Sequence, residues 1–138
     1  MNSIVLDSAA VLAMIQGEPG GERVDALLDA VELGTDVKVA MSSVNWCEVL
    51  TRMQRENEEA AAEELSKDLS ALLAGVELVQ FGKAAAEVAA GYSRVNRSLS
   101  LGERACLALA KSLHATAWTA DRFWGQCNLD VAIELIRV

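Results

Sequence analysis

The sequence lacks the features of several large protein classes. No apolar run approaches the ~20 residues needed to span a membrane, and no basic segment precedes the first apolar run, so neither a membrane span nor a signal peptide is predicted. A hydrophobic fraction of 52% and a charged fraction of 23% are typical of an ordinary globular protein. The length of 138 residues predicts a single domain over residues 1–138.

Cysteine and histidine are scarce, and they lack the spacing of a structural framework. Cys47, Cys106 and Cys127 are odd in number, and no Cys-x-x-Cys pair or Cys/His ligand pattern is present. We interpret them as reduced, buried thiols. A cytoplasmic protein is therefore predicted rather than one that depends on disulfides or zinc.

Basic residues are also in the minority. Lys and Arg number 12 against 20 Asp and Glu, which gives a net charge of −8. This charge argues against broad, non-specific nucleic-acid binding, which requires a basic surface, but it does not exclude a nuclease. Part of the acidic excess lies between residues 56 and 68, where we interpret it as the solvated face of one helix.

Short apolar runs typical of β-strands alternate with amphipathic segments typical of helices. The predicted strands lie at 3–6, 37–41, 76–81, 115–119 and 131–138. The predicted helices lie at 9–15, 23–33, 58–73, 83–95 and 102–113, with one more after the serines at 42–43 and a short turn or helix at 121–125. This alternation predicts an α/β fold with three α/β/α layers and a mostly parallel central sheet.

Four acidic residues stand at the openings of four core-forming segments. Asp7 follows the first strand, Glu48 lies in SSVNWCEVL, Glu103 lies in LSLGERACLALA, and Asp121 follows a late strand in WTADRFW. Carboxylates among apolar residues are costly without a cationic partner, and parallel sheets bind ligands beyond the carboxyl ends of their strands. Mg²⁺ and Mn²⁺ prefer carboxylate oxygen, so these acids are predicted to share a metal site.

The same segments carry a resemblance to a known family. Four segments resemble the signature segments of the PIN-domain family, specifically of VapC-type toxins, and they occur in the same order with similar gaps. They are IVLDSAAVLAMIQGEPG, SSVNWCEVL, LSLGERACLALAKSL and TADRFW. The resemblance implies a PIN-like fold and a Mg²⁺-dependent endoribonuclease in which Mn²⁺ can substitute. It also implies the toxin of a toxin–antitoxin pair, homodimeric and inhibited by a cognate antitoxin.

The resemblance assigns catalytic and metal-binding roles to the four acids. Asp7, Glu48 and Asp121 match acids of the family pattern. Glu103 departs from it, because the family usually has aspartate there, and glutamate moves the carboxylate out by about 1.5 Å.

Other residues are assigned supporting roles. Asn45, one helical turn before Glu48, and Thr119 match polar companions of the family's acids, and Ser8 is predicted to hydrogen-bond the site. RNA contacts are predicted for four arginines in the segments that flank two of the acids, which are Arg94, Arg97, Arg104 and Arg122.

The predicted chemistry is in-line attack of a metal-activated water on an RNA phosphate. Metals held by carboxylates activate water, stabilise the charge that develops on phosphate and assist the leaving oxygen. No histidine is needed as a base. The single histidine, His114, is interpreted as a residue at a helix C-terminus.

The acids also have alternative interpretations. Glu48 has the spacing to pair with Arg52, Glu103 suits a helix N-terminus, and Asp121 suits the N-cap of a short helix. The alternative function is a catalytically weak or inactive PIN-like protein that binds RNA or a partner, for which Glu103 in place of aspartate leaves room.

Two other α/β classes are disfavoured. A phospho-acceptor receiver domain needs a second acid beside the first and a lysine at a late strand end, but Leu6 and Ser8 flank Asp7 and no such lysine is present. A haloacid-dehalogenase-type phosphatase needs a second aspartate at position 9, which is Ala9.

Overall fold

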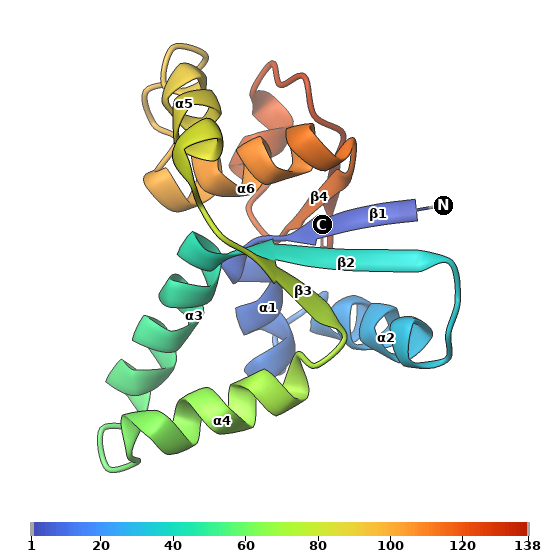
Figure 1. Cartoon of the computed structure of the whole chain (residues 1–138), viewed down its shortest axis with the longest axis vertical. Coiled ribbons are helices and arrows are strands. Elements are labelled where there is room, and N and C mark those ends of the chain that lie inside the picture. The colour runs from blue at the N-terminus through green and yellow to red at the C-terminus, as the bar shows by residue number, and fades with distance from the viewer. Residues whose placement is uncertain (1, 138) are drawn as a thin grey trace.

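A five-stranded parallel sheet runs through the middle of the protein (Figure 1). The computed structural model describes residues 2–137. The strand order is β3-β2-β1-β4-β5, and every neighbouring pair is parallel, so the predicted sheet is confirmed. The strands are β1 (Asn2–Leu6), β2 (Val37–Ser42), β3 (Val76–Val79), β4 (Thr116–Thr119) and β5 (Ile133–Leu135).

Helices cover both faces of this sheet, so the predicted α/β/α layers are confirmed (Figure 1). On one face a core joins the sheet to α1, α2, α3 and α4, and on the other a second core joins it to α5, α6 and η1. Their bounds are α1 (Ser8–Ile15), α2 (Gly21–Glu32), α3 (Ser43–Glu56), α4 (Ala62–Leu72), α5 (Lys83–Tyr92), α6 (Leu101–Leu113) and the 3-10 helix η1 (Arg122–Gln126).

Side chains of the central strands alternate between the two cores. Ile4 and Leu6 of β1 enter the core with α1 to α4, and Val5 enters the core with α5 and α6. In β2, Met41 enters the core with α1 to α4, and Ala40 enters the core with α5 and α6. A strand buried on both faces needs apolar residues at every position, which explains why it is a continuous apolar run in the sequence.

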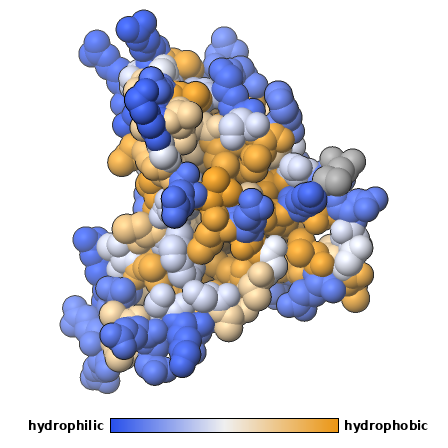
Figure 2. Space-filling view, viewed as in Figure 1, coloured by the Kyte–Doolittle hydropathy of each residue, from blue (hydrophilic) through white to orange (hydrophobic). Residues whose placement is uncertain are grey.

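One predicted helix begins later than expected. The segment predicted as a helix over 58–73 forms a helix only from Ala62, because α3 continues to Glu56 and Asn57 ends it. The side-chain amide of Asn57 donates to the Met53 carbonyl at 2.8 Å. The acidic residues there therefore lie on two helices and their connection, not on one helix face, and Figure 2 shows this end of the molecule as hydrophilic.

The last strand is shorter than predicted. β5 lies at the edge of the sheet and pairs with β4 over Ile133–Leu135. Of the predicted range 131–138, Val138 lies outside the described residues. The single histidine is the C-cap of α6, as predicted, and adopts a left-handed conformation there.

The three cysteines are free, as expected, but they differ in exposure. Cys106 is buried and Cys127 is half-buried. The prediction of a buried thiol was wrong for Cys47, which lies on a solvent-facing position of α3. In the part of the chain that the structure describes, no helix has the length and apolar character to cross a membrane.

A buried indole fixes the segment that follows β4. Trp124 is 1% exposed, and its Nε1–H donates to Glu103 Oε2 at 2.6 Å. Glu103 also completes a capping box on α6, in which its Oε1 accepts the Ser100 backbone N–H at 3.0 Å and its own backbone N–H donates to the Ser100 hydroxyl. One carboxylate thus joins α6 to η1.

Trp124→Phe is expected to lower the free energy of unfolding by about 2–3 kcal/mol, because it removes a charge-assisted hydrogen bond and some buried volume. Urea denaturation measures the change. Trp46→Phe is the matched control, since Trp46 is half-buried and its indole makes no hydrogen bond to the described residues. Equal losses in the two variants would show that the contact with Glu103 contributes nothing.

Candidate functional site

The candidate site lies at the carboxyl ends of β1 and β4, which are neighbours in the sheet. Asp7 follows β1 directly, and Asp121 lies two residues beyond β4. Glu48 comes from the second turn of α3, the helix that follows β2. The negative charges of Glu48 and Asp121 both act on Asp7 and raise its pKa. The fold therefore gathers three of the four predicted acids.

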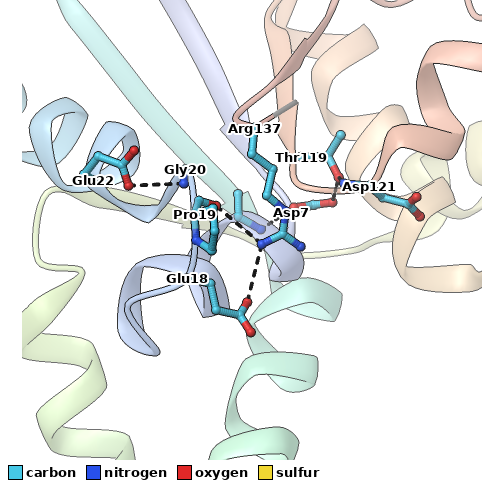
Figure 3. A network of polar contacts seen from close by, with 9 residues as sticks. Asp7, Glu18, Pro19, Gly20, Glu22, Thr119, Asp121 and Arg137 are labelled. Carbon is cyan, nitrogen blue, oxygen red and sulfur yellow. Dashed lines mark hydrogen bonds and ion pairs between the residues drawn. The ribbon is translucent and has the colours of Figure 1, made fainter.

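Asp7 is the most deeply buried of these acids, at 4% exposure. Its Oδ1 accepts the backbone N–H of Ala10 at 2.8 Å, which makes Asp7 the N-cap of α1. Its Oδ2 accepts the hydroxyl of Thr119, whose oxygen in turn accepts the backbone N–H of Asp121 at 3.0 Å. Thr119 therefore links the two acids, which lie close together in Figure 3.

The surroundings of Asp7 disfavour its charge. The pKa of Asp7 is raised from 3.8 to about 7: burial is the largest cause, the charges of Glu48 and Asp121 act in the same direction, and the hydrogen bonds from Thr119 and Ala10 act against it. Burial also raises the pKa of the Cys106 thiol well above its ordinary value, and the charges of Asp7 and Glu48 add to that effect. The site therefore has a negative potential that lacks compensation.

Glu48 lies against the first turn of α6. Its Oε1 accepts the Ser8 hydroxyl at 2.9 Å and the Asn45 side-chain amide at 3.0 Å. Asn45 also donates to the Gly102 carbonyl at 2.9 Å. A Cβ atom at Gly102 would clash with the Glu48 carboxylate, so glycine makes room for the acid.

The alternative pairing of Glu48 with Arg52 is wrong. Arg52 pairs instead with Glu56, at 2.7 Å, on the exposed side of α3. The carboxylate of Glu48 is directed toward the site by neutral donors, which leaves its charge without a cationic partner among residues 2–137.

Glu103 and Asp121 both have the local roles that the alternatives described. Glu103 belongs to the capping box of α6, and its carboxylate is held by Ser100 and Trp124. Asp121 is the N-cap of η1, since its Oδ1 accepts the Phe123 backbone N–H at 2.9 Å. Asp121 is exposed, and its Oδ2 accepts no hydrogen bond from the described residues.

The oxygen atoms at the site are of the chemical type that a hard divalent cation prefers. Within residues 2–137, no three Asp, Glu, Cys or His side chains converge closely enough to form a ready-made metal centre. The carboxylates of Asp7, Glu48 and Asp121 nevertheless have no ion pair there, and the buried Oδ1 of Asn45 has no hydrogen-bond partner. Uncompensated carboxylates and an orphaned amide oxygen are the donors that Mg²⁺ and Mn²⁺ prefer.

The arginines predicted to contact RNA lie in different surroundings. Arg104 is bound to the protein, because its guanidinium donates to the backbone carbonyls of Leu99 and Ala89, each at 3.3 Å. Arg94 and Arg97 are exposed in the connection between α5 and α6. Arg122 is exposed at the start of η1, next to Asp121 in the sequence.

Arg137 is a basic residue near the acids that the sequence analysis missed. It lies two residues beyond β5, and it lines one cavity together with Arg122 and Asp121. Figure 3 shows it between Glu18 and the segments after β1 and β4, which carry Asp7 and Asp121. The rule that parallel strands present their carboxyl ends at one edge applies to β5 as well, so the signal was present.

Comparisons with known proteins agree with this fold. One chain of a toxin–antitoxin complex from Klebsiella pneumoniae is 15% identical with a TM-score of 0.65, and the similarity covers 86% of each chain. A chain of VapBC-1 from nontypeable Haemophilus influenzae is 15% identical with a TM-score of 0.68, over 97% of this chain and 98% of that one. A chain of DNA-bound VapBC from Salmonella typhimurium is 14% identical with a TM-score of 0.67, over 99% of each chain.

At these identities the structural similarities show a shared fold. No curated protein matches the chain. The model of the PIN domain, by contrast, matches residues 4–125, which is most of the sequence and includes all four acids. The chain therefore belongs to the PIN-domain family.

Proposed function

We propose that the protein is a metal-dependent endoribonuclease that acts as the toxin of a toxin–antitoxin pair. The observation that carries the proposal is the group formed by Asp7, Glu48 and Asp121, three carboxylates gathered at the strand ends without a cation in the part of the chain that the structure describes. Membership of the PIN-domain family and the similarity in fold to a toxin–antitoxin complex support it.

In this proposal the acids hold Mg²⁺, with Mn²⁺ able to substitute. Asp7 is the central ligand, Asp121 and Glu48 complete the set, and Glu103 contributes through water from its place in the capping box. When bound, the cation supplies an activated water and a positive charge beside the RNA phosphate.

Neutral side chains orient the ligands in this scheme. Ser8 and Asn45 hold the Glu48 carboxylate from one side, and Thr119 holds Asp7 relative to Asp121. Partners of this kind add no charge of their own, so the full negative charge of the ligands is available to a cation. In the metal-free protein near neutral pH, Asp7 carries a proton in part of the molecules, and Asp7 would have to lose this proton to hold a cation.

The proposed partners are RNA, a cognate antitoxin and a second copy of the chain in a homodimer. Large apolar side chains stay exposed on β3, α5 and α6, among them Leu78, Val88 and Leu101, and this supports protein partners. The free cysteines are consistent with a reducing cytoplasmic setting, and we propose that residues 1–138 act as one domain.

A second candidate function is a PIN-like protein that binds RNA or its partner with weak or no cleavage. One observation favours it. The carboxylate of Glu103, which stands where the family usually has aspartate, already accepts hydrogen bonds from Ser100 and Trp124.

Cleavage of total cellular RNA by purified, antitoxin-free protein tests the proposal. We expect discrete products with Mg²⁺ or Mn²⁺, none with EDTA, and none from Asp7→Asn, because that variant loses the central ligand. The variant keeps the volume of the side chain, so it serves as the folded control. Cleavage by Asp7→Asn at the wild-type rate would exclude Asp7 as the central ligand, and RNA binding without cleavage by the wild type would favour the second candidate.

The stability of metal-free Asp7→Asn is expected to exceed that of the wild type above neutral pH. The folded protein binds the Asp7 proton more tightly than the unfolded chain, because burial raises the pKa from 3.8 to about 7. The stability from this proton is complete below pH 3.8 and is lost as the pH rises through about 7. Thermal denaturation in EDTA should therefore show a Tm several degrees higher for the variant at about pH 8, and similar values at about pH 4.

Mg²⁺ is expected to reduce or reverse the difference in Tm between Asp7→Asn and the wild type, because a ligand that binds only the folded state stabilises it. The Tm of the wild type should rise with Mg²⁺ near neutral pH, and the Tm of Asp7→Asn should not. An equal rise in both proteins would show that the cation binds elsewhere.

Gly102→Ala is expected to reduce cleavage and Mg²⁺ affinity at least about tenfold, because the new methyl group displaces the Glu48 carboxylate. The stability should change by less than about 1 kcal/mol, since the clashing atoms end a flexible side chain and alanine favours the helix. Calorimetric Mg²⁺ titration and RNA cleavage measure the two effects. Gly91→Ala in α5 is the control, because nothing lies within 4 Å of its added Cβ. Full activity in Gly102→Ala would remove Glu48 from the site.

A further inference from the structure

An open cavity of about 550 Å³ lies beside the acids. Its lining residues come from α1, from the segment after β4 and from the segment after β5, and they are Ala9, Ala120, Asp121, Arg122 and Arg137. Asp121 belongs both to this cavity and to the candidate site, so the two are continuous. The two arginines give the rest of the cavity wall a positive charge. The two alanines have small side chains and leave the cavity open to a ligand.

The charge of Arg137 is only weakly compensated. Its guanidinium lies 3.7 Å from Glu18 and donates to the Pro19 carbonyl at 3.4 Å, both near the upper limit for such contacts (Figure 3). The side chains of Arg137 and Glu18 are 35% and 45% exposed, and an ion pair with that exposure contributes little to stability. A guanidinium has five N–H donors, so most of them remain for another acceptor.

Arg122 has no ion pair among residues 2–137, and neither arginine pairs with Asp121. Two positive side chains therefore border one cavity without an acid that neutralises them closely. This contrasts with the net charge of −8, which repels polyanions overall.

The backbone holds Arg137 close to the site. Gly20, in the connection between α1 and α2, has a φ of +89°, and a Cβ atom there would lie 2.6 Å from the Ile136 carbonyl oxygen. This close approach fastens the segment after β5 to the turn that carries Glu18 and Pro19. Main-chain packing at Ile136 therefore holds the backbone that precedes Arg137 against this turn, in addition to the weak pair between Arg137 and Glu18.

We infer that this cavity binds a backbone phosphate of the RNA next to the one at the acids, with Arg137 and Arg122 as its ligands. The inference rests on the proposed function. Arginine binds phosphate oxygens through two parallel N–H donors, and contacts of this kind position a nucleic acid without reading its sequence. An RNA strand with one phosphate at the acids would place its neighbouring phosphate in this cavity, because Asp121 lines both the site and the cavity.

The test is RNA binding in the Asp7→Asn background, which prevents cleavage during the measurement. The probe is short single-stranded fragments of total cellular RNA with a fluorescent label, titrated by anisotropy at several salt concentrations. Adding Arg137→Gln or Arg122→Gln is expected to weaken binding about tenfold. Each is also expected to make the slope of log K against log salt less steep by about 0.7, the value for one single-strand phosphate contact.

Three further variants separate phosphate binding from a structural role. Arg55→Gln changes the net charge equally at the far end of α3 and should bind RNA as the background does. Arg137→Lys keeps the charge and should keep the salt slope. Glu18→Gln removes the ion pair of Arg137 and should bind RNA at least as tightly, whereas a structural pair would make it behave like Arg137→Gln. Thermal denaturation of each protein reports on folding.

The outcomes distinguish this inference from the proposed function. If the Asp7→Asn background binds RNA but Arg137→Gln keeps the same affinity and salt slope as Arg55→Gln, the phosphate site is wrong and the nuclease proposal stands. Weakening by Glu18→Gln to the level of Arg137→Gln would also overturn the phosphate site. If the background binds no RNA and the wild type cleaves none, the proposed function fails and the inference fails with it.

Discussion

The candidate site is built around a carboxylate that the fold buries with no cationic partner among residues 2–137. Asp7 follows the central strand β1, and its partners are neutral, the backbone N–H of Ala10 and the hydroxyl of Thr119. Two hydrogen bonds do not offset the loss of hydration, so the pKa rises to about 7. The same desolvation that costs stability in the metal-free protein favours the binding of a cation, so the proposed activity depends on a residue whose charge destabilises the metal-free fold.

The parallel sheet explains why other charged groups collect around this residue. β2 and β4 flank β1, so the elements that follow these strands meet at one edge, α3 with Glu48 and the turn with Asp121. β5 extends the same edge and brings Arg137 beside Asp121. In our proposals the acids bind the divalent cation and the arginines bind a phosphate of the RNA, so groups of opposite charge lie side by side.

Much of this arrangement follows from local sequence patterns. Asp7 and Asp121 each follow an apolar run that becomes a strand, and the strand rule alone indicates one edge for both. The same reasoning was incomplete where the exposure of a side chain or the end of a helix depends on residues that are neighbours in space. Cys47 is exposed although Trp46 and Val49 close to it in the sequence are apolar, and Asn57 separates two helices within a segment of strong helix formers.

The sequence by itself determined the α/β class, the parallel sheet and the edge at which Asp7 and Asp121 lie, because hydrophobic periodicity and strand ends are local properties. Only the tertiary structure decided which groups touch there. Trp124 reaches Glu103 across 21 positions, Ser8 reaches Glu48 across 40, and Arg137 reaches Pro19 across 118. Such contacts depend on how helices and turns pack against the sheet, and no periodicity within the chain encodes the distance between segments so far apart.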